Sequence, residues 1–283
     1  MKGEIPTATV INLSQTFGDD DETSKFATRY LRTTHCDLFF ADAAILVEGS
    51  AERMLIPHFI RAAFRKLDQS YISLLEIGGA HAHRLKPLLD AIGLLSLVVT
   101  DVDSILETGS GKVRPERGKG YRTGNTTLKD WIPQIELLDD LLDLSSEKKQ
   151  TADGLVRVAY QCPITVGYRE SGGEDQAIPY TFEDSLALTN LALFRGYAEP
   201  VGLLNRLQAS LGKDTLEDAA NDMFRNLEKG SKAEMALELL YRSEPNELEP
   251  PDYIADGLKW LEKSLEAKTV DAILTEPEEA NGA

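Results

Sequence analysis

The sequence has 283 residues and a formal net charge of −17, with 30 Lys and Arg against 47 Asp and Glu. Hydrophobic residues make up 42% and charged residues 27%, ordinary values for a globular protein that argue against a disordered chain, a collagen-like chain or a disulfide scaffold. The length suits one large domain or two small ones. Taken alone, the acidic charge also argues against nucleic acid as a partner, because phosphate backbones attract basic proteins.

The sequence carries no signal for export or membrane insertion. The N-terminus lacks the apolar core of a signal peptide, and the longest apolar runs, such as 43–47 and 94–99, are too short to span a bilayer. Cys36 and Cys162 lie far apart and belong to no C-x-x-C pair, so we expect neither a disulfide nor a zinc site. These features predict a cytoplasmic protein with two free thiols.

The chain begins with a predicted linker over residues 1–36, in which an acidic run at 18–22 is typical of a solvated loop. An alternation of strands and helices follows. Apolar runs at 44–47, 71–77 and 94–100 predict three buried strands. Two helical patterns separate them, the first with Ser50 as its expected N-cap and the second over 83–92. This spacing predicts a parallel sheet with right-handed crossovers.

A glycine-rich basic segment comes next, over 108–127. Between positions 112 and 122 it holds five positive charges and one negative charge, or +4 locally. The basic residues are Lys112, Arg114, Arg117, Lys119 and Arg122. Beyond it, residues 128–144 predict a helix and residues 155–159 predict a fourth strand.

From Glu183 onward the pattern is entirely helical. We predict helices near 184–195, 200–211, 215–229, 232–242 and 253–267. The expected organisation is therefore an α/β domain over 37–182, a helical domain over 183–270 and a disordered tail over 271–283.

Five carboxylates are candidates for a metal site: Glu48, Glu52, Asp101, Asp103 and Glu183. Glu48 and the Asp101/Asp103 pair follow predicted strands, and the carboxyl ends of parallel strands meet at one edge of the sheet. Glu52 lies one helical turn after Glu48, so the two can face the same pocket. Asp101 and Asp103 are two apart past a strand end, which points them the same way. Carboxylates without His or Cys suit Mg²⁺ or Mn²⁺.

The pair His81-x-His83 also resembles a metal-ligand pair. It follows a glycine pair at a predicted strand-to-helix turn and has no matching third nitrogen ligand, so we interpret it as structural or solvent-facing.

Four segments carry a resemblance to a known family. "ILVEGSAE" and "VVTDVD", about 50 residues apart, resemble the Toprim domain of topoisomerases, primases and several nucleases. "DLFFADAAILVEGSAERMLIP", "YTFEDSLALTN" and "KGSKAEMALEL" are similar to segments of the OLD (overcoming lysogenization defect) nucleases, in which a Toprim domain follows an ABC-type ATPase domain. The resemblance extends from Asp37 to Leu240.

The resemblance implies a Toprim-like parallel sheet flanked by helices, joined to an all-helical domain. It implies a metal-dependent endonuclease that nicks or cleaves duplex DNA, with two Mg²⁺ or Mn²⁺ ions on the five carboxylates. Glu48, Asp101 and Lys232 would be catalytic, Lys232 by placing a positive charge near the scissile phosphate. The basic segment would contact the DNA backbone.

The ATPase part of that family is missing from the sequence. GSGK at 109–112 resembles a phosphate-binding loop, but position 106 is Leu where the motif needs Gly, and Val113 replaces the required Ser or Thr. We therefore expect the chain to be the catalytic half of a longer ATPase-nuclease.

Two alternatives stay open. One is a Toprim topoisomerase or primase, of which the topoisomerase needs a nucleophilic Tyr that the sequence does not identify. The other is a catalytically silent regulatory or DNA-binding module. If the carboxylates bind cations, the net charge no longer excludes DNA, and we expect weak, strongly salt-dependent DNA binding.

Overall fold

The computed structural model of the chain describes Lys25 and residues 36–78, 81–109, 111–169, 173–244 and 247–275. The predicted acidic loop at 18–22, most of the predicted linker and the tail after 275 lie outside these ranges.

The centre of the molecule is a four-stranded sheet formed by β1 (Ala43–Val47), β2 (Ile72–Glu76), β3 (Ser96–Val99) and β6 (Val156–Ala159). The strand order is β2-β1-β3-β6, and each neighbouring pair is parallel. The predicted α/β fold with a parallel sheet is therefore confirmed. The central strands β1 and β3 are wholly buried, which explains their continuous apolar sequences.

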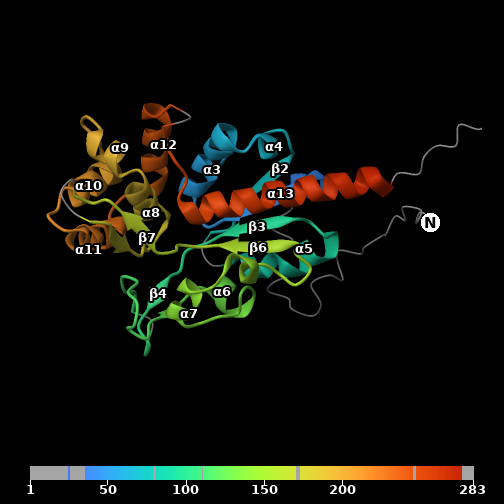
Figure 1. Cartoon of the computed structure of the whole chain (residues 1–283), viewed down its shortest axis with the longest axis horizontal. Helices are drawn as coiled ribbons and strands as arrows, with labels where there is room; N and C mark the ends of the chain where they lie inside the picture. The colour runs from blue at the N-terminus through green and yellow to red at the C-terminus, as the bar shows by residue number, and fades with distance from the viewer. Residues whose placement is uncertain are drawn as a thin grey trace, which may run out of the picture.

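Helices cover both faces of this sheet (Figure 1). One face packs against α3 (Ser50–Ala63), α4 (Arg65–Asp68) and α13 (Asp252–Thr275). The other packs against α5 (Lys86–Ile92), α6 (Thr126–Asp130) and α7 (Leu138–Leu142). Successive strand residues point to opposite faces, so Ile45 belongs to the first core and Leu46 to the second.

The remaining helices form a separate group beside the sheet, at the left of Figure 1. They are α8 (Phe182–Thr189), α9 (Leu191–Gly196), α10 (Gly202–Leu211), α11 (Leu216–Leu227) and α12 (Lys232–Arg242). The chain then returns to the sheet through α13, where a Cβ on Gly257 would lie 2.9 Å from Leu97 Cδ1 of β3. The predicted boundary at residue 183 stays a prediction. The tail predicted from 271 also stays a prediction; α13 extends to Thr275, and the residues after it are outside the described ranges.

The described residues also contain three short 3₁₀ helices: η1 (Cys36–Phe40), η2 (Ala82–Leu85) and η3 (Ser146–Lys149). Two small antiparallel hairpins were not predicted. They are β4 (Ser104–Ile105) with β5 (Arg122–Thr123), and β7 (Ile164–Val166) with β8 (Asp175–Ala177). Their strands have two or three residues, too few to give an alternating pattern.

Two other local predictions are wrong. The helix expected over 128–144 is interrupted between α6 and α7, because Pro133 has no N–H to donate to the preceding turn. Ser50 is the first residue of α3 rather than its cap; Gly49 is the N-cap, without a side-chain hydrogen bond.

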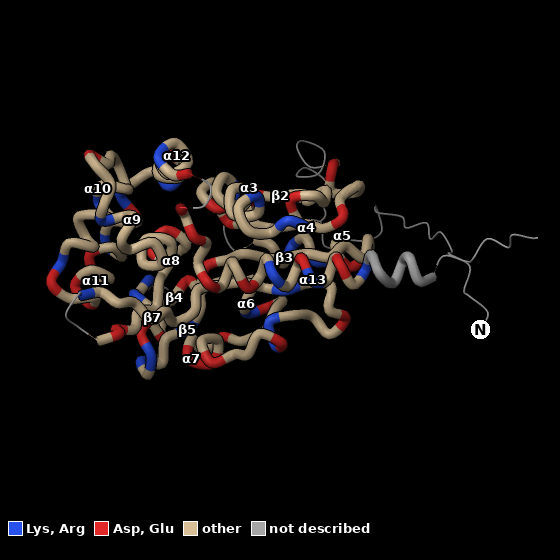
Figure 2. Tube along the Cα trace, turned by 45° about the horizontal axis from the view of Figure 1, so that its top comes forward, with Lys and Arg blue, Asp and Glu red and all other residues tan. Residues whose placement is uncertain are grey.

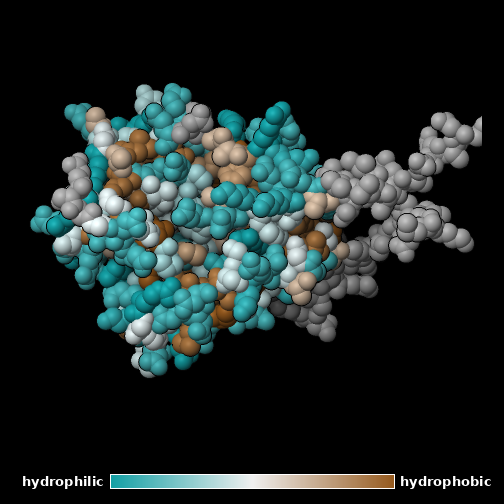
Figure 3. Space-filling model, viewed as in Figure 1, coloured by the Kyte–Doolittle hydropathy of each residue, from teal (hydrophilic) through white to brown (hydrophobic). Residues whose placement is uncertain are grey.

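The surface is mostly hydrophilic on the face shown in Figure 3, with small, separate apolar areas. Within the described ranges, none of the helices combines the length and apolar character that a membrane span requires. Cys36 and Cys162 are both free thiols, as predicted.

Candidate active site

The candidate site is built at the carboxyl ends of the paired strands β1 and β3. Glu48 follows β1, and Asp101 and Asp103 follow β3. The backbone N–H of Asp101 donates to Glu48 Oε1 over 3.1 Å, although 53 positions separate the two residues. The convergence that we predicted from strand order is therefore present in the structure.

Glu48 is held by three donors that meet at one of its oxygens. Thr100 Oγ1, the Asp101 N–H and Asn125 Nδ2 all donate to Oε1, the last over 3.0 Å. Burial and the charge of Asp103 nevertheless raise the pKa of Glu48 above its usual range, and the three hydrogen bonds oppose that rise. The hydrogen bonds thus fix the direction of the Glu48 carboxylate, while burial and Asp103 disfavour its ionised form.

Glu52 lies in the first turn of α3, where an acid would ordinarily be solvated and favour the helix N-terminus. It is 4% exposed. Burial, followed by the charge of Glu183, raises the pKa of Glu52 to about 8. Glu52 therefore belongs to the buried carboxylate cluster, as predicted from its spacing to Glu48.

Asp101 and Asp103 differ in burial and in backbone conformation. Asp101 is buried, and burial together with the charge of Glu48 raises its pKa well above the usual range. Asp103 has φ +44°, a left-handed conformation, so the strand alternation that we used to align the pair does not continue to this position. Burial raises the pKa of Asp103, and the charges of Lys112 and Lys232 oppose the rise.

Glu183 and Lys232 form an ion pair across two helices of the helical group. Lys232 Nζ at the start of α12 lies 2.8 Å from Glu183 Oε2 in the first turn of α8. Thr181 Oγ1 donates to the same oxygen over 2.8 Å. Burial disfavours the charged form of Lys232, but Glu183 and Asp101 outweigh it and raise the pKa of the ammonium. Glu183 is fully buried, and within the described chain its Oε1 has no hydrogen-bond partner.

Electrostatic coupling joins these groups into one site. The pKa of Asp101 is raised by the charges of Glu48, Glu52 and Glu183 and lowered by the charge of Lys232. The structure therefore brings together the five predicted carboxylates and the predicted lysine, drawn from β1, α3, β3, α8 and α12.

The donor set fits a hard divalent cation. It consists of carboxylate oxygens, and the unpartnered Oε1 of Glu183 is a buried oxygen that could accept a cation. The described residues contain no group of three or more His, Cys, Asp or Glu side chains already drawn together around one ion position. The His81 and His83 rings, with centroids 6.3 Å apart, form no such group either.

Two buried amide side chains support the site and were not predicted from the sequence. Asn125 Nδ2 lies within hydrogen-bonding distance of Glu48 Oε1, Thr100 Oγ1 and the Asp101 carbonyl, while its Oδ1 caps α6. Gln161 Nε2 donates to Asp101 Oδ1 over 2.5 Å. A signal for Gln161 existed, because it stands two residues after the predicted fourth strand, at the same sheet edge as Asp101.

The basic segment is largely neutralised by acidic partners. Four of its five cations make ion pairs: Arg114 with Glu116 at 2.8 Å, Arg117 with Asp143 at 2.7 Å, Lys119 with Glu116 at 3.8 Å and Arg122 with Glu136 at 3.1 Å. In Figure 2 the region around β4, β5 and α7 carries both blue and red positions. Only Lys112 acts on the site, by opposing the rise in the pKa of Asp103. The local charge of +4 therefore counts cations that are paired with acids, two of which, Asp143 and Glu136, lie outside positions 112–122.

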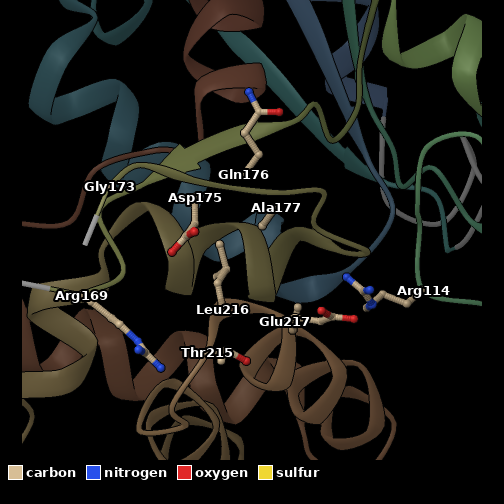
Figure 4. A pocket seen from close by; sticks show the side chains of 10 residues that line it. Arg114, Arg169, Gly173, Asp175, Gln176, Ala177, Thr215, Leu216 and Glu217 are labelled. Atoms are coloured by element: carbon tan, nitrogen blue, oxygen red, sulfur yellow. The ribbon is translucent and has the colours of Figure 1, made fainter. Parts of the chain in front are cut away.

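A pocket of about 580 Å³ lies apart from these carboxylates. Arg114, Arg169 and Gln176 line it together with the start of α11 (Figure 4). Asp175 and Glu217 also line it, so its charges are mixed. The candidate site is identified by converging charges rather than by this cavity.

Comparisons with known proteins show what the chain is similar to. Residues 39–103 match the family model described as "Overcoming lysogenization defect protein-like, TOPRIM domain". The chain is 28% identical over 261 residues to "Endonuclease GajA" of Bacillus cereus (strain HuB5-5), an alignment that covers 86% of this chain and 34% of that endonuclease. The chain thus spans about a third of the length of this relative.

Solved structures of OLD proteins are also similar to the chain. The C-terminal region of the Burkholderia pseudomallei OLD protein has 20% identity and a TM-score of 0.45, covering 80% of this chain and 99% of that one. The C-terminal region of the Xanthomonas campestris pv. campestris OLD protein has 17% identity and a TM-score of 0.43, covering 83% and 99%.

Proposed function

Residues 39–103 belong to the Toprim domain of overcoming-lysogenization-defect-like proteins, and from that premise we propose that this chain is a divalent-metal-dependent endonuclease that nicks or cleaves duplex DNA. The observation that carries the proposal is the meeting of five carboxylates and one lysine at the carboxyl edge of the sheet. The similarity to an endonuclease supports the same reaction class.

The residues that would hold two Mg²⁺ or Mn²⁺ ions are Glu48, Glu52, Asp101, Asp103 and Glu183. Bound ions would supply a water of lowered pKa and charge stabilisation for the leaving oxygen. The raised pKa values of Glu48, Glu52 and Asp101 favour this role. Burial and neighbouring negative charges disfavour the ionised form of each acid, and a bound cation would stabilise that form.

Lys232 would neutralise the negative charge that develops on the phosphate. Its ammonium already lies among the carboxylates, 2.8 Å from Glu183 Oε2, and its raised pKa keeps it charged throughout the physiological range. Charge placed in advance in a partly buried site stabilises the transition state without a reorganisation penalty. Asn125 and Gln161 would hold Glu48 and Asp101 in fixed directions meanwhile.

A topoisomerase reaction fits the described residues less well. Tyr180 and Tyr253 are the tyrosines whose pKa values respond to the site carboxylates, and both are buried. Burial and the neighbouring negative charges raise the pKa of each above its usual value, which disfavours the phenolate that would attack phosphorus. We also propose an ABC-type ATPase portion as the partner of this chain, since the chain covers 34% of its endonuclease relative.

Plasmid cleavage tests the proposal. The purified chain is incubated with supercoiled plasmid and Mg²⁺ or Mn²⁺, beside an Asp101→Ala variant. We expect nicked or linear DNA from the unaltered chain and a cleavage rate at least 100-fold lower in the variant. Equal products from both proteins would contradict the nuclease, relaxed covalently closed circles would favour the topoisomerase, and neither cleavage nor metal binding would favour the silent module.

A further inference from the structure

Gln161 has an amide whose orientation is fully determined. The residue is completely buried beyond the end of β6. Its Oε1 accepts the backbone N–H of Val102 over 2.9 Å, and its Nε2 donates to Asp101 Oδ1 over 2.5 Å. Rotating the amide by 180° would set an oxygen against the Asp101 carboxylate and an NH₂ against an N–H donor, so a single orientation is allowed.

This amide acts on Asp101 in a way that a basic residue could not. It fixes the position of Oδ1 and with it the direction of the whole carboxylate, whose second oxygen, Oδ2, takes no part in this contact. A lysine or arginine at this place would also orient Asp101, but its positive charge would compete with a cation for the same oxygens. The neutral amide fixes the direction of the carboxylate and preserves the negative charge that an ion would need.

The helix α13 supports the amide from behind. Tyr253, in its first turn, is 6% exposed and places its hydroxyl 3.3 Å from Gln161 Nε2. Four residues later, Gly257 brings α13 close to Leu97 of β3. The position of Tyr253 against Gln161 therefore depends on how α13 packs on the sheet.

We propose that Gln161 is a positioning residue for metal binding: with Tyr253 of α13 behind it, it holds Asp101 in the one direction that presents Oδ2 to a divalent ion. The inference rests on the proposed nuclease function and deepens it. It assigns to the C-terminal helix a part in assembling the site, through a chain of contacts that runs from Tyr253 through Gln161 to Asp101.

Gln161→Met and Gln150→Met form a matched pair of variants for the test. Both glutamines join the sheet side of the molecule to an aromatic residue of α13, since Gln150 Oε1 accepts from Trp260 Nε1 over 3.0 Å. Only Gln161 touches Asp101. Mn²⁺ binding to the full chain is measured by electron paramagnetic resonance in the absence of DNA, and plasmid cleavage is measured as a function of Mn²⁺ concentration.

We expect Gln161→Met to weaken Mn²⁺ binding and raise the half-maximal Mn²⁺ concentration for cleavage by about 10- to 100-fold, with most of the maximal rate regained at saturating Mn²⁺. Gln150→Met should stay within about 2-fold of the unaltered chain by the same measures. Tyr253→Phe keeps the ring and removes the hydroxyl, and it should weaken Mn²⁺ binding in the same way but by less. It replaces Gln161→Met in the test if that variant fails to fold.

Two different failures can be told apart. If the unaltered chain binds Mn²⁺ and cleaves DNA while Gln161→Met and Tyr253→Phe match it, the role of Gln161 is wrong and the nuclease stands. If the unaltered chain neither binds Mn²⁺ nor cleaves DNA, the proposed function fails and takes this inference with it.

Discussion

Glu52 shows at the scale of one residue how the site opposes the stability of the fold. Its pKa is about 8 in the folded chain, against an ordinary value of 4.5. An acid whose pKa is raised by folding binds an extra proton in the folded state between these two values. The free energy of unfolding therefore falls as pH rises through that window, and ionised Glu52 destabilises the protein above it.

Glu52→Gln should consequently stabilise the metal-free chain, and more so at pH 8.5 than at pH 5, because the amide never ionises. Thermal unfolding in the presence of a chelator measures the difference in Tm at each pH. Glu249→Gln, an exposed carboxylate, provides the control and should give a pH-independent difference near zero. A Tm advantage for Glu52→Gln that stays constant or shrinks with rising pH would contradict the buried charge.

The residues that could be predicted from sequence are those marked by their own chemistry. Glu48 and Asp101 are charged and follow apolar strands, so strand order alone brought them together. Asn125 and Gln161 carry no such mark, because a neutral amide is common on any surface. Their importance comes from contacts with residues 77 and 60 positions away, which only the folded chain supplies.

At the scale of elements, the apolar strands of four or five residues and the amphipathic helices were predictable, and the strands of two or three residues were not. The parallel sheet follows from continuous buried runs, whereas β4 and β5 have two residues each and leave no pattern. The strand β4 matters nonetheless, because its residue Ile105 also pairs with Lys112 of the basic segment. The positive charge of Lys112 opposes the rise in the pKa of Asp103.

The packing of α12 against α10 sets the position of Lys232. Gly230 lies two residues before Lys232, and a Cβ there would meet Leu203 Cβ of α10 at 2.7 Å. Gly230→Ala should therefore displace the start of α12, lower stability by about 1–3 kcal/mol and reduce plasmid cleavage.

Gly196→Ala is the matched control for this change, because a Cβ at Gly196 meets nothing within 4 Å. Urea unfolding and plasmid cleavage are compared for both variants. Unchanged stability and cleavage in Gly230→Ala would show that Lys232 does not depend on this close approach.

At the scale of the whole molecule, the net charge of −17 and the ion pairs of the basic segment both weaken attraction to phosphate. The excess of acidic residues repels phosphate and most cations of the basic segment are paired, so this chain should bind DNA weakly and lose that binding readily as salt rises. Glu116 contributes most to this masking, because it pairs with both Arg114 and Lys119.

Glu116→Gln should release these two cations and tighten DNA binding. The plot of log binding constant against log salt concentration should become steeper by about 1 to 2, since each new phosphate contact contributes about 0.9. Fluorescence anisotropy with a labelled duplex over a range of KCl concentrations measures both quantities. Glu266→Gln on α13 makes the same change of charge away from the basic segment. If it tightens binding equally, net charge rather than unmasking is responsible.

The contacts that assemble the site span the chain: Asp101 to Glu48 across 53 positions, Gln161 to Asp101 across 60, and Tyr253 to Gln161 across 92. None of them can form until the later partner has been synthesised and folded. A chain still emerging from the ribosome would hold its acids on unconnected segments and would lack the helix behind Gln161. If the proposed nuclease function holds, the site would be assembled only after α13 has folded against Gln161.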